Sequence, residues 1–221
     1  MQMTAKKMSD RGLLALVRHE GIVPGPYTDV KQVWTFGIGH TAAAGAPDPA
    51  TMPRGMPADL YAGIREAFRV FRSDLARYEA AVLRAVKVPL EPHEFDALVS
   101  FHYNTGGIAK AALTRHLNAG DRAAAAAAFM GWLKPAAIQA RREAERDLFA
   151  TGRYPAGTIP VWSVDRNGRV DFSRPVCRLS EAEALALLRP SGTPMPPPAQ
   201  PATKPSWWQR LASLFTGKET T

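Results

Sequence analysis

Three side chains near the beginning of the sequence could together perform general acid–base chemistry: the carboxyl groups of Glu20 and Asp29 and the hydroxyl of Thr35. A carboxylic acid that is partly removed from water keeps its proton and can donate it to a leaving group. A carboxylate beside a hydroxyl can hold one water molecule between them, so that the carboxylate takes its proton and the hydroxyl fixes its orientation. Taken singly, a solvated glutamate at a helix end and an aspartate in a turn are the commoner interpretations of such residues.

A short helix must position Glu20. Ser9 is a good N-cap, and Gly21 is a natural helix end directly after the glutamate. Glu20 follows Leu13 by seven residues, so it lies within about 20° of Leu13 around the helix axis. The carboxyl group therefore continues the apolar stripe of the helix, whose members are Leu13, Leu16 and Val17.

A β-hairpin must position Asp29 and Thr35. Residues 27–30 and 33–38 are rich in the aromatic and β-branched types that favour strands. With residues 31–33 as the loop, Asp29 is expected opposite Thr35. Opposed residues project to the same side of a hairpin, roughly 5 Å apart at their Cβ atoms. The sequence therefore predicts that the carboxylate and the hydroxyl lie side by side.

The combined pattern resembles a known signature. The spacing E-x8-D-x5-T-x-G-x-G-x-T resembles the active-site motif of phage-type lysozymes, glycoside hydrolase family 24, and Tyr27 also fits. Segments 95–107, 113–121 and 140–152 are similar to the central and last helices of that family, in the same order. The resemblance covers residues 10–153. The residues that carry the motif are Glu20, Asp29, Thr35, Gly37, Gly39 and Thr41.

The resemblance implies a peptidoglycan-degrading glycosidase that hydrolyses the β-1,4 bond between N-acetylmuramic acid and N-acetylglucosamine. By this resemblance, Glu20 would protonate the leaving glycosidic oxygen. Asp29 would support the transition state and activate a water, which Thr35 would orient. The family is similar to inverting enzymes, whose two carboxyl groups stand about 6.5–9.5 Å apart. No cofactor is implied.

The resemblance also suggests supporting residues. Arg141 is expected against the catalytic Glu20, and Phe101 and Asn104 on the substrate-binding far wall of the cleft. Where the family usually has a glycine, three residues after the aspartate, this chain has Gln32; a left-handed backbone there costs about 1 kcal/mol. The five histidines show no metal-ligand spacing, so no metal site is expected.

The rest of the chain predicts the frame for these residues. A 3,4,3,4 spacing of large apolar residues traces one long helix, and further helices are expected at 94–103, 111–118, 122–133 and 136–150. We therefore expect an α+β fold that is mainly helical and lysozyme-like: a small N-terminal β-hairpin lobe, a larger helical lobe and an active-site cleft between them. The residues of the long helical stripe are Phe68, Phe71, Leu75, Tyr78 and Val82.

We divide the chain into four parts. Residues 1–155 are expected to form the catalytic domain, and 156–189 an appended β-hairpin, turning at Asn167-Gly168, with a short helix. Residues 190–206 form a Pro-rich linker. Residues 207–221 form a short amphipathic segment whose apolar face runs from Trp207 to Phe215. That segment either contacts a membrane or protein surface or is a frayed tail.

Composition limits the classes of partner. The 221 residues are 46% apolar and carry a net charge of +8, which suits an anionic partner. No nucleic-acid-binding motif is present, so we expect no nucleic acid partner, and we expect a monomer. One cysteine excludes an internal disulfide. Without a secretion signal, the enzyme is expected in the host cytoplasm before release and then at the cell wall in the periplasm.

Two alternatives to a lysozyme stay open from the sequence. A lytic transglycosylase cleaves the same bond with chiefly one glutamate, and the presence of Asp29 and Thr35 at family spacing argues against it. A non-catalytic cell-wall or membrane binder would use the basic body and the C-terminal segment. Such a binder has no need of both Glu20 and Asp29.

Overall fold

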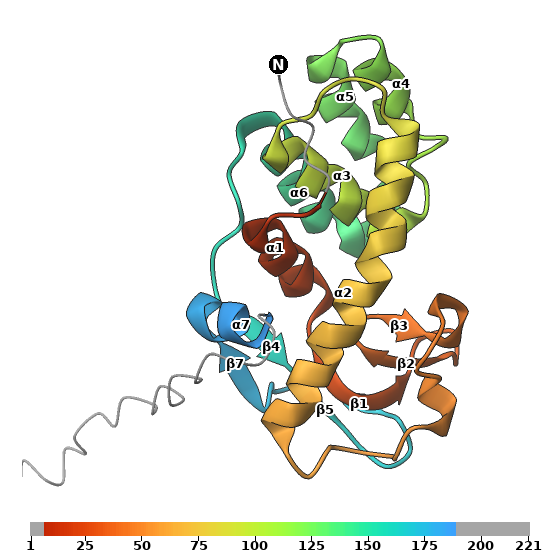
Figure 1. Cartoon of the computed structure of the whole chain (residues 1–221), viewed down its shortest axis with the longest axis vertical. Helices are drawn as coiled ribbons and strands as arrows, with labels where there is room; N and C mark the ends of the chain where they lie inside the picture. Colours follow the sequence, from red (N-terminus) through yellow and green to blue (C-terminus); the bar gives the residue numbers. More distant parts are fainter. Residues whose placement is uncertain (1–6, 189–221) are drawn as a thin grey trace, which may run out of the picture.

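The computed structural model describes residues 7–188, and the predicted mainly helical α+β architecture is confirmed (Figure 1). The helices are α1 (Asp10–Glu20), α2 (Leu60–Ala85), α3 (Pro92–Thr105), α4 (Ala112–Asn118), α5 (Arg122–Ala128), α6 (Gln139–Thr151) and α7 (Glu181–Leu188). The strands are β1 (Val23–Thr28), β2 (Trp34–Gly37), β3 (His40–Thr41), β4 (Ile159–Val161), β5 (Ser163–Val164), β6 (Val170–Asp171) and β7 (Cys177–Leu179). Short 3-10 turns are η1 (Ala42–Ala44), η2 (Pro49–Thr51), η3 (Phe129–Gly131) and η4 (Ala136–Ile138).

Helix α1 begins and ends where the sequence predicts. The Ser9 hydroxyl oxygen accepts a hydrogen bond from the Gly12 N–H at 3.0 Å, and Gly21 ends the helix with φ 71°. The Ser9 hydroxyl also donates to the buried carboxylate of Asp96 on α3 at 2.5 Å. The N-terminus of α1 is therefore fixed to the central helix of the protein, while its C-terminus carries Glu20 to the sheet.

The N-terminal sheet has the strand order β1-β2-β3, and both pairs are antiparallel. Its first hairpin differs from the predicted register: Thr35 lies opposite Tyr27 and not opposite Asp29, so that prediction is wrong by two residues. Because strand side chains alternate with a period of two, a shift of two leaves each strand residue on its expected face. Thr35 and Tyr27 therefore share one side of the hairpin.

The shift arises because the turn is centred on Lys31, one residue earlier than predicted. Strand β1 already ends at Thr28, and the next four residues form a turn closed by a 3.0 Å hydrogen bond from the Gln32 N–H to the Asp29 carbonyl. Gln32 adopts φ 61°, a left-handed conformation that favours glycine. Asp29 is consequently a turn residue and not a strand residue.

Helix α2 joins the sheet to the helical lobe. Figure 1 shows it running from beside β1–β3 to the group formed by α3, α4, α5 and α6. Its predicted stripe is confirmed, since Phe68, Phe71, Leu75 and Val82 are buried in the main core and Tyr78 packs against it. The helix expected at 122–133 is shorter than predicted, because the chain tightens into a 3-10 turn after Ala128.

Residues 159–188 pack onto the same core. The hairpin predicted around Asn167-Gly168 is confirmed as β5–β6, with Gly168 at φ 78°. Strand β4 pairs antiparallel with β7, and α7 lies against α1 and α2. The apolar members of this segment that join the main core include Ile159, Val161, Leu179, Ala184, Leu187 and Leu188.

Within residues 7–188 no helix combines the length and the apolar character that a membrane crossing requires. The Pro-rich stretch 190–206 and the amphipathic segment 207–221 lie outside the described residues.

Candidate functional site

Glu20 is the last residue of α1, and its side chain is 23% exposed. The expected contact with Arg141 is present: the Arg141 Nη1 donates to Glu20 Oε1 at 2.6 Å. Arg141 belongs to α6, which lies 121 residues further along the chain. Glu20 is thus reachable by solvent on one side and held by a buried cation on the other.

Arg141 is itself held by a buried network. Its Nε donates to Glu145 Oε1 at 3.0 Å, and the Ser100 hydroxyl donates to that same oxygen at 2.7 Å. Arg142 pairs with the second oxygen of Glu145. Burial opposes the charge of Arg141, but the carboxylates of Glu20 and Glu145 raise its pKa above the ordinary value. The i,i+4 and i,i+3 spacing of these arginines from Glu145 is visible in the sequence, and it is the signal that could have revealed the network.

His19, next to Glu20, is a neutral neighbour of the site. Burial, together with the nearby charges of Arg141, Arg142 and Arg18, lowers the pKa of His19 to about 4. The imidazole therefore adds no positive charge beside Glu20 near neutral pH.

Asp29 is partly buried in the β1–β2 turn. Its Oδ1 accepts hydrogen bonds from the backbone N–H groups of Lys31 and Val33, both at 2.8 Å. In the part of the chain that the structure describes, Oδ2 accepts no hydrogen bond. The turn therefore fixes one carboxylate oxygen and leaves the other for a ligand or a water molecule.

Thr35 is buried, and its hydroxyl donates to the Val33 carbonyl at 3.0 Å. The hydroxyl proton is thereby used inside the hairpin. The lone pairs of Thr35 Oγ1 remain able to accept a hydrogen bond from a water molecule.

Two tyrosines lie near the candidate catalytic carboxyl groups. Burial raises the pKa of Tyr27, and the charges of Glu20 and Asp29 raise it further, so the phenol lies within electrostatic range of both carboxyl groups. Burial and the charge of Glu20 likewise raise the pKa of Tyr103, whose hydroxyl donates to the Ile38 carbonyl. Tyr103 was not singled out from the sequence, and no spacing rule distinguishes it from other aromatic residues of α3.

The two residues expected on the substrate-binding wall, Phe101 and Asn104, differ in burial. Phe101 is fully buried and packs edge-on against Phe129 and Trp132, with the Arg142 guanidinium over its ring. It is therefore a core residue and does not line a substrate surface in this structure. Asn104 is exposed on α3, and its side-chain oxygen accepts a hydrogen bond from Arg142.

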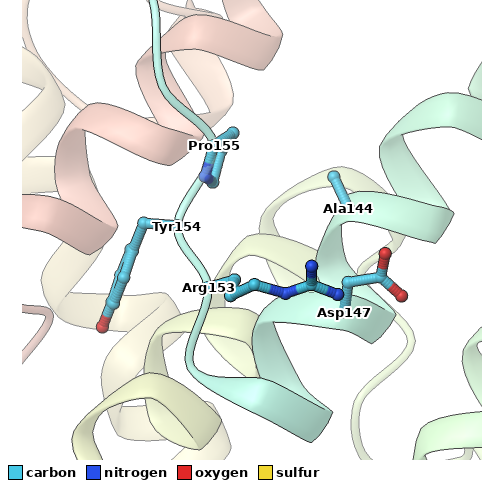
Figure 2. Close-up of a pocket in the computed structure, with 5 residues that line it drawn as sticks. All are labelled: Ala144, Asp147, Arg153, Tyr154 and Pro155. Carbon is cyan, nitrogen blue, oxygen red and sulfur yellow. The ribbon is translucent and has the colours of Figure 1, made fainter.

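A separate hollow lies away from these residues. It has a volume of about 260 Å³ and lies between α6 and the chain that follows it (Figure 2). Figure 2 shows Arg153 extended towards Asp147, with the Tyr154 ring pointing away from both. None of the six predicted site residues lines it; its lining is Ala144, Asp147, Arg153, Tyr154 and Pro155. Across residues 7–188, no group of three or more His, Cys, Asp or Glu side chains could hold a metal ion.

Comparison with known proteins agrees with this arrangement. The chain is 34% identical over 149 residues to the endolysin of Salmonella phage P22, covering 65% of this chain and 97% of that one. It is 33% identical over 154 residues to an endolysin of Acyrthosiphon pisum secondary endosymbiont phage 1, with 64% and 97% covered. The solved endolysin of Escherichia coli O157:H7 phage FAHEc1 superposes with a TM-score of 0.60 at 28% identity, covering 70% of this chain and 99% of that one.

The phage lysozyme family model matches residues 17–145, which is more than half of the chain, and the chain belongs to that family. The matched stretch contains Glu20, Asp29, Thr35 and Arg141. The protein is accordingly a lysozyme, a glycosidase that degrades the peptidoglycan of the bacterial cell wall.

Proposed function

We propose that Glu20 is the general acid and Asp29 the general base of an inverting hydrolysis of the β-1,4 bond between N-acetylmuramic acid and N-acetylglucosamine. The observation that carries this proposal is that the fold holds one oxygen of each carboxyl group: Arg141 bonds Oε1 of Glu20 at the end of α1, and two backbone N–H groups bond Oδ1 of Asp29 in the β1–β2 turn. A bond between two sugars needs a proton donor on one side and an activated water on the other.

Glu20 supplies the proton. Arg141 bonds Oε1, so the transferable proton is carried on Oε2. As the proton moves to the leaving oxygen, the glutamate becomes anionic beside a buried guanidinium that is already in place. The charge that develops on Glu20 is stabilised without rearrangement of the protein.

Asp29 supplies the base. Its Oδ1 is held by two backbone N–H groups, which fix the orientation of the carboxylate. Oδ2 takes the proton of a water molecule, and Thr35 Oγ1 accepts that water's second hydrogen. The water attacks the face of the sugar opposite to the leaving group, which gives inversion.

The catalytic groups together have to lower the activation free energy of hydrolysis by a large amount. A lysozyme must lower the barrier for cleaving a glycosidic bond by well over ~10 kcal/mol. General acid catalysis accounts for ~3–5 kcal/mol of this. The anionic Asp29 and the fixed donors around the site must supply much of the rest.

Glu20→Gln tests the acid. Glutamine keeps the size of the side chain and an oxygen for Arg141, so folding should be retained. We expect the rate of peptidoglycan hydrolysis to fall by about 10²–10⁴. Glu66→Gln, on the surface pair with Arg69, is the control and should keep full activity. Full activity of Glu20→Gln would remove Glu20 from the proposal.

Asp29→Asn tests the base against a purely structural role, and the chain contains a matched control. Asp165 forms the same kind of turn, since its Oδ1 accepts from the N–H groups of Asn167 and Arg169 at 2.8 and 2.9 Å. Asparagine keeps these acceptor bonds in both variants. Only Asp29→Asn should lose activity, by about 10² or more. Equal activity of the two variants would leave Asp29 as a turn residue.

The products and the pH profile test the mechanism as a whole. Nuclear magnetic resonance of fresh product should show the α-anomer at the new reducing end. Mass spectrometry should show no 1,6-anhydro ends, which a lytic transglycosylase would leave. Activity should be bell-shaped in pH, because one carboxyl group must be ionised while the other is protonated. A flat profile between about pH 4 and pH 9 would contradict the pair.

We further propose that the substrate contacts Asn104 and Arg141 on the helical side of the site. The enzyme acts as a monomer. It stays in the host cytoplasm before release and then acts on the cell wall in the periplasm. The net charge of +8 supports attraction to an anionic wall. Fractionation of the host before and after lysis tests the location of the enzyme. Size-exclusion chromatography of the purified enzyme tests its oligomeric state. Whether residues 207–215 contact a membrane is tested by flotation of the full chain with anionic vesicles.

A further inference from the structure

Residues 160–168 run along the edge of β1 that does not pair with β2. The Ile22 N–H donates to the Pro160 carbonyl at 3.1 Å, and the Trp162 N–H donates to the Ile22 carbonyl at 2.8 Å. At the other end of β1, the Thr28 N–H donates to the Gly168 carbonyl at 2.9 Å. This segment therefore bonds the chain two residues after Glu20 and again one residue before Asp29.

Trp162 lies directly against the end of α1. A Cβ atom placed on Gly21 would stand 2.7 Å from Trp162 Nε1, so the indole occupies the space beside the residue that follows Glu20. Across residues 7–188 the indole N–H donates to no acceptor. It remains available to a hydroxyl or acetamido oxygen of a ligand.

Phe172 extends this surface outward. Its ring packs edge-on against Trp162, with centroids 5.4 Å apart at 66°. Phe172 is 66% exposed, and Trp162 is partly exposed. An exposed pair of large aromatic side chains is uncommon on a protein surface unless it binds a ligand.

We infer that Trp162 and Phe172 form an additional saccharide-binding platform, which holds the peptidoglycan glycan strand beside the bond that is hydrolysed. This inference rests on the proposed role of Glu20. A pyranose ring has an apolar face of C–H groups and a rim of polar groups. The exposed aromatic rings match the apolar face, and the indole N–H matches the rim. Both residues lie outside the stretch 17–145 that matches the family, so the platform is a feature of the further part of this chain.

The test compares kinetics on long glycan strands and on short soluble fragments. Trp162→Leu removes the ring and the donor but keeps an apolar side chain. We expect its KM for long strands to rise about tenfold with kcat within twofold, since an interaction shared by bound substrate and transition state is lost. Phe172→Leu should raise KM by a smaller factor, and Trp162→Phe should restore most of the affinity.

Tyr61→Leu is the matched control for a loss of packing between residues 159–188 and the rest of the protein. Tyr61 is a partly exposed aromatic residue of α2, close to Cys177 and Glu183 and therefore at another part of the same segment. It should lower the melting temperature without a selective rise in KM. If Trp162→Leu and Phe172→Leu leave KM unchanged, or only lower stability as Tyr61→Leu does, the platform is refuted.

A binding measurement separates this inference from the proposed catalytic roles. Pelleting of the Glu20→Gln protein with insoluble peptidoglycan reports affinity without turnover. Adding Trp162→Leu should reduce the bound fraction and raise the apparent Kd about tenfold. An unchanged Kd overturns the platform even when Glu20→Gln is inactive. A fully active Glu20→Gln protein overturns the acid assignment, whatever happens to Kd.

Discussion

The turn that presents Asp29 contains a residue in a conformation that suits glycine. Gln32 adopts φ 61°, and its side chain is exposed. A left-handed backbone costs an L-residue about 1–2 kcal/mol relative to glycine. Glycine in turn loses about 0.5–1 kcal/mol more conformational entropy on folding. Gln32→Gly should therefore stabilise the protein by about 0.5–1 kcal/mol.

Gln32→Ala is the control, because alanine keeps a Cβ and so keeps the left-handed cost. Thermal unfolding of the two variants and the parent measures the difference. For a chain of this size, each kcal/mol corresponds to about 2–4 °C in Tm. We expect Gln32→Gly to melt about 1–4 °C above Gln32→Ala. Activity should be unchanged in both, since the Gln32 N–H bond to the Asp29 carbonyl is a backbone bond.

Two outcomes would refute this reasoning. Equal Tm values for the glycine and alanine variants would show that the turn stores no strain at this position. A fall in activity in both Gln32→Gly and Gln32→Ala would show that the side chain, and not the backbone, holds Asp29 in place.

Three further predictions concern the remainder of the molecule. Because the pKa of His19 is lowered to about 4, the unfolded chain binds a proton between about pH 6.5 and 4 that the folded protein does not bind. The free energy of unfolding should therefore decrease as the pH falls through this window, by up to about 3 kcal/mol more than in His19→Gln. Denaturant unfolding of both proteins at pH 7 and 4.5 measures the difference. A parallel pH dependence of the two proteins would contradict it. Gly12→Ala would place a Cβ 2.3 Å from the Asp96 carboxyl carbon and should cost about 2–3 kcal/mol, whereas Gly131→Ala, with open space around it, should be nearly neutral. Deleting residues 190–221 removes none of the described contacts and should leave hydrolysis of soluble wall fragments within twofold of the full chain; a large loss would make that tail part of the catalytic unit.

Local signals predicted the helix that carries Glu20. The Ser9 cap, the apolar stripe and Gly21 each act within one or two helical turns, and all three are present in the structure. The contact between Glu20 and Arg141 spans 121 residues, and only the likeness to a known family suggested it. Short-range physics fixes where a helix begins and ends, but not which distant helix packs against it.

The errors have equally physical causes. The hairpin register depends on which residue the turn is centred on, and the bond from the Gln32 N–H to the Asp29 carbonyl could not be read from residue types. Phe101 lies in a helix whose several faces are buried, so periodicity could not separate core from substrate wall. The docking of residues 159–188 against β1 has no local signal, since edge-strand pairing is set by tertiary packing.

The contacts of the catalytic segment also bear on its timing during synthesis. Glu20, Ile22 and Thr28 take partners at Arg141, Pro160 and Gly168, all made by the ribosome more than a hundred residues later. A nascent chain that has not yet emerged beyond these partners lacks the cation beside the acid and the outer neighbour of β1. Such late, long-range pairing is expected to delay completion of the site until the chain has emerged as far as Gly168. A nascent chain that stops short of Arg141 is thereby expected to lack lytic activity.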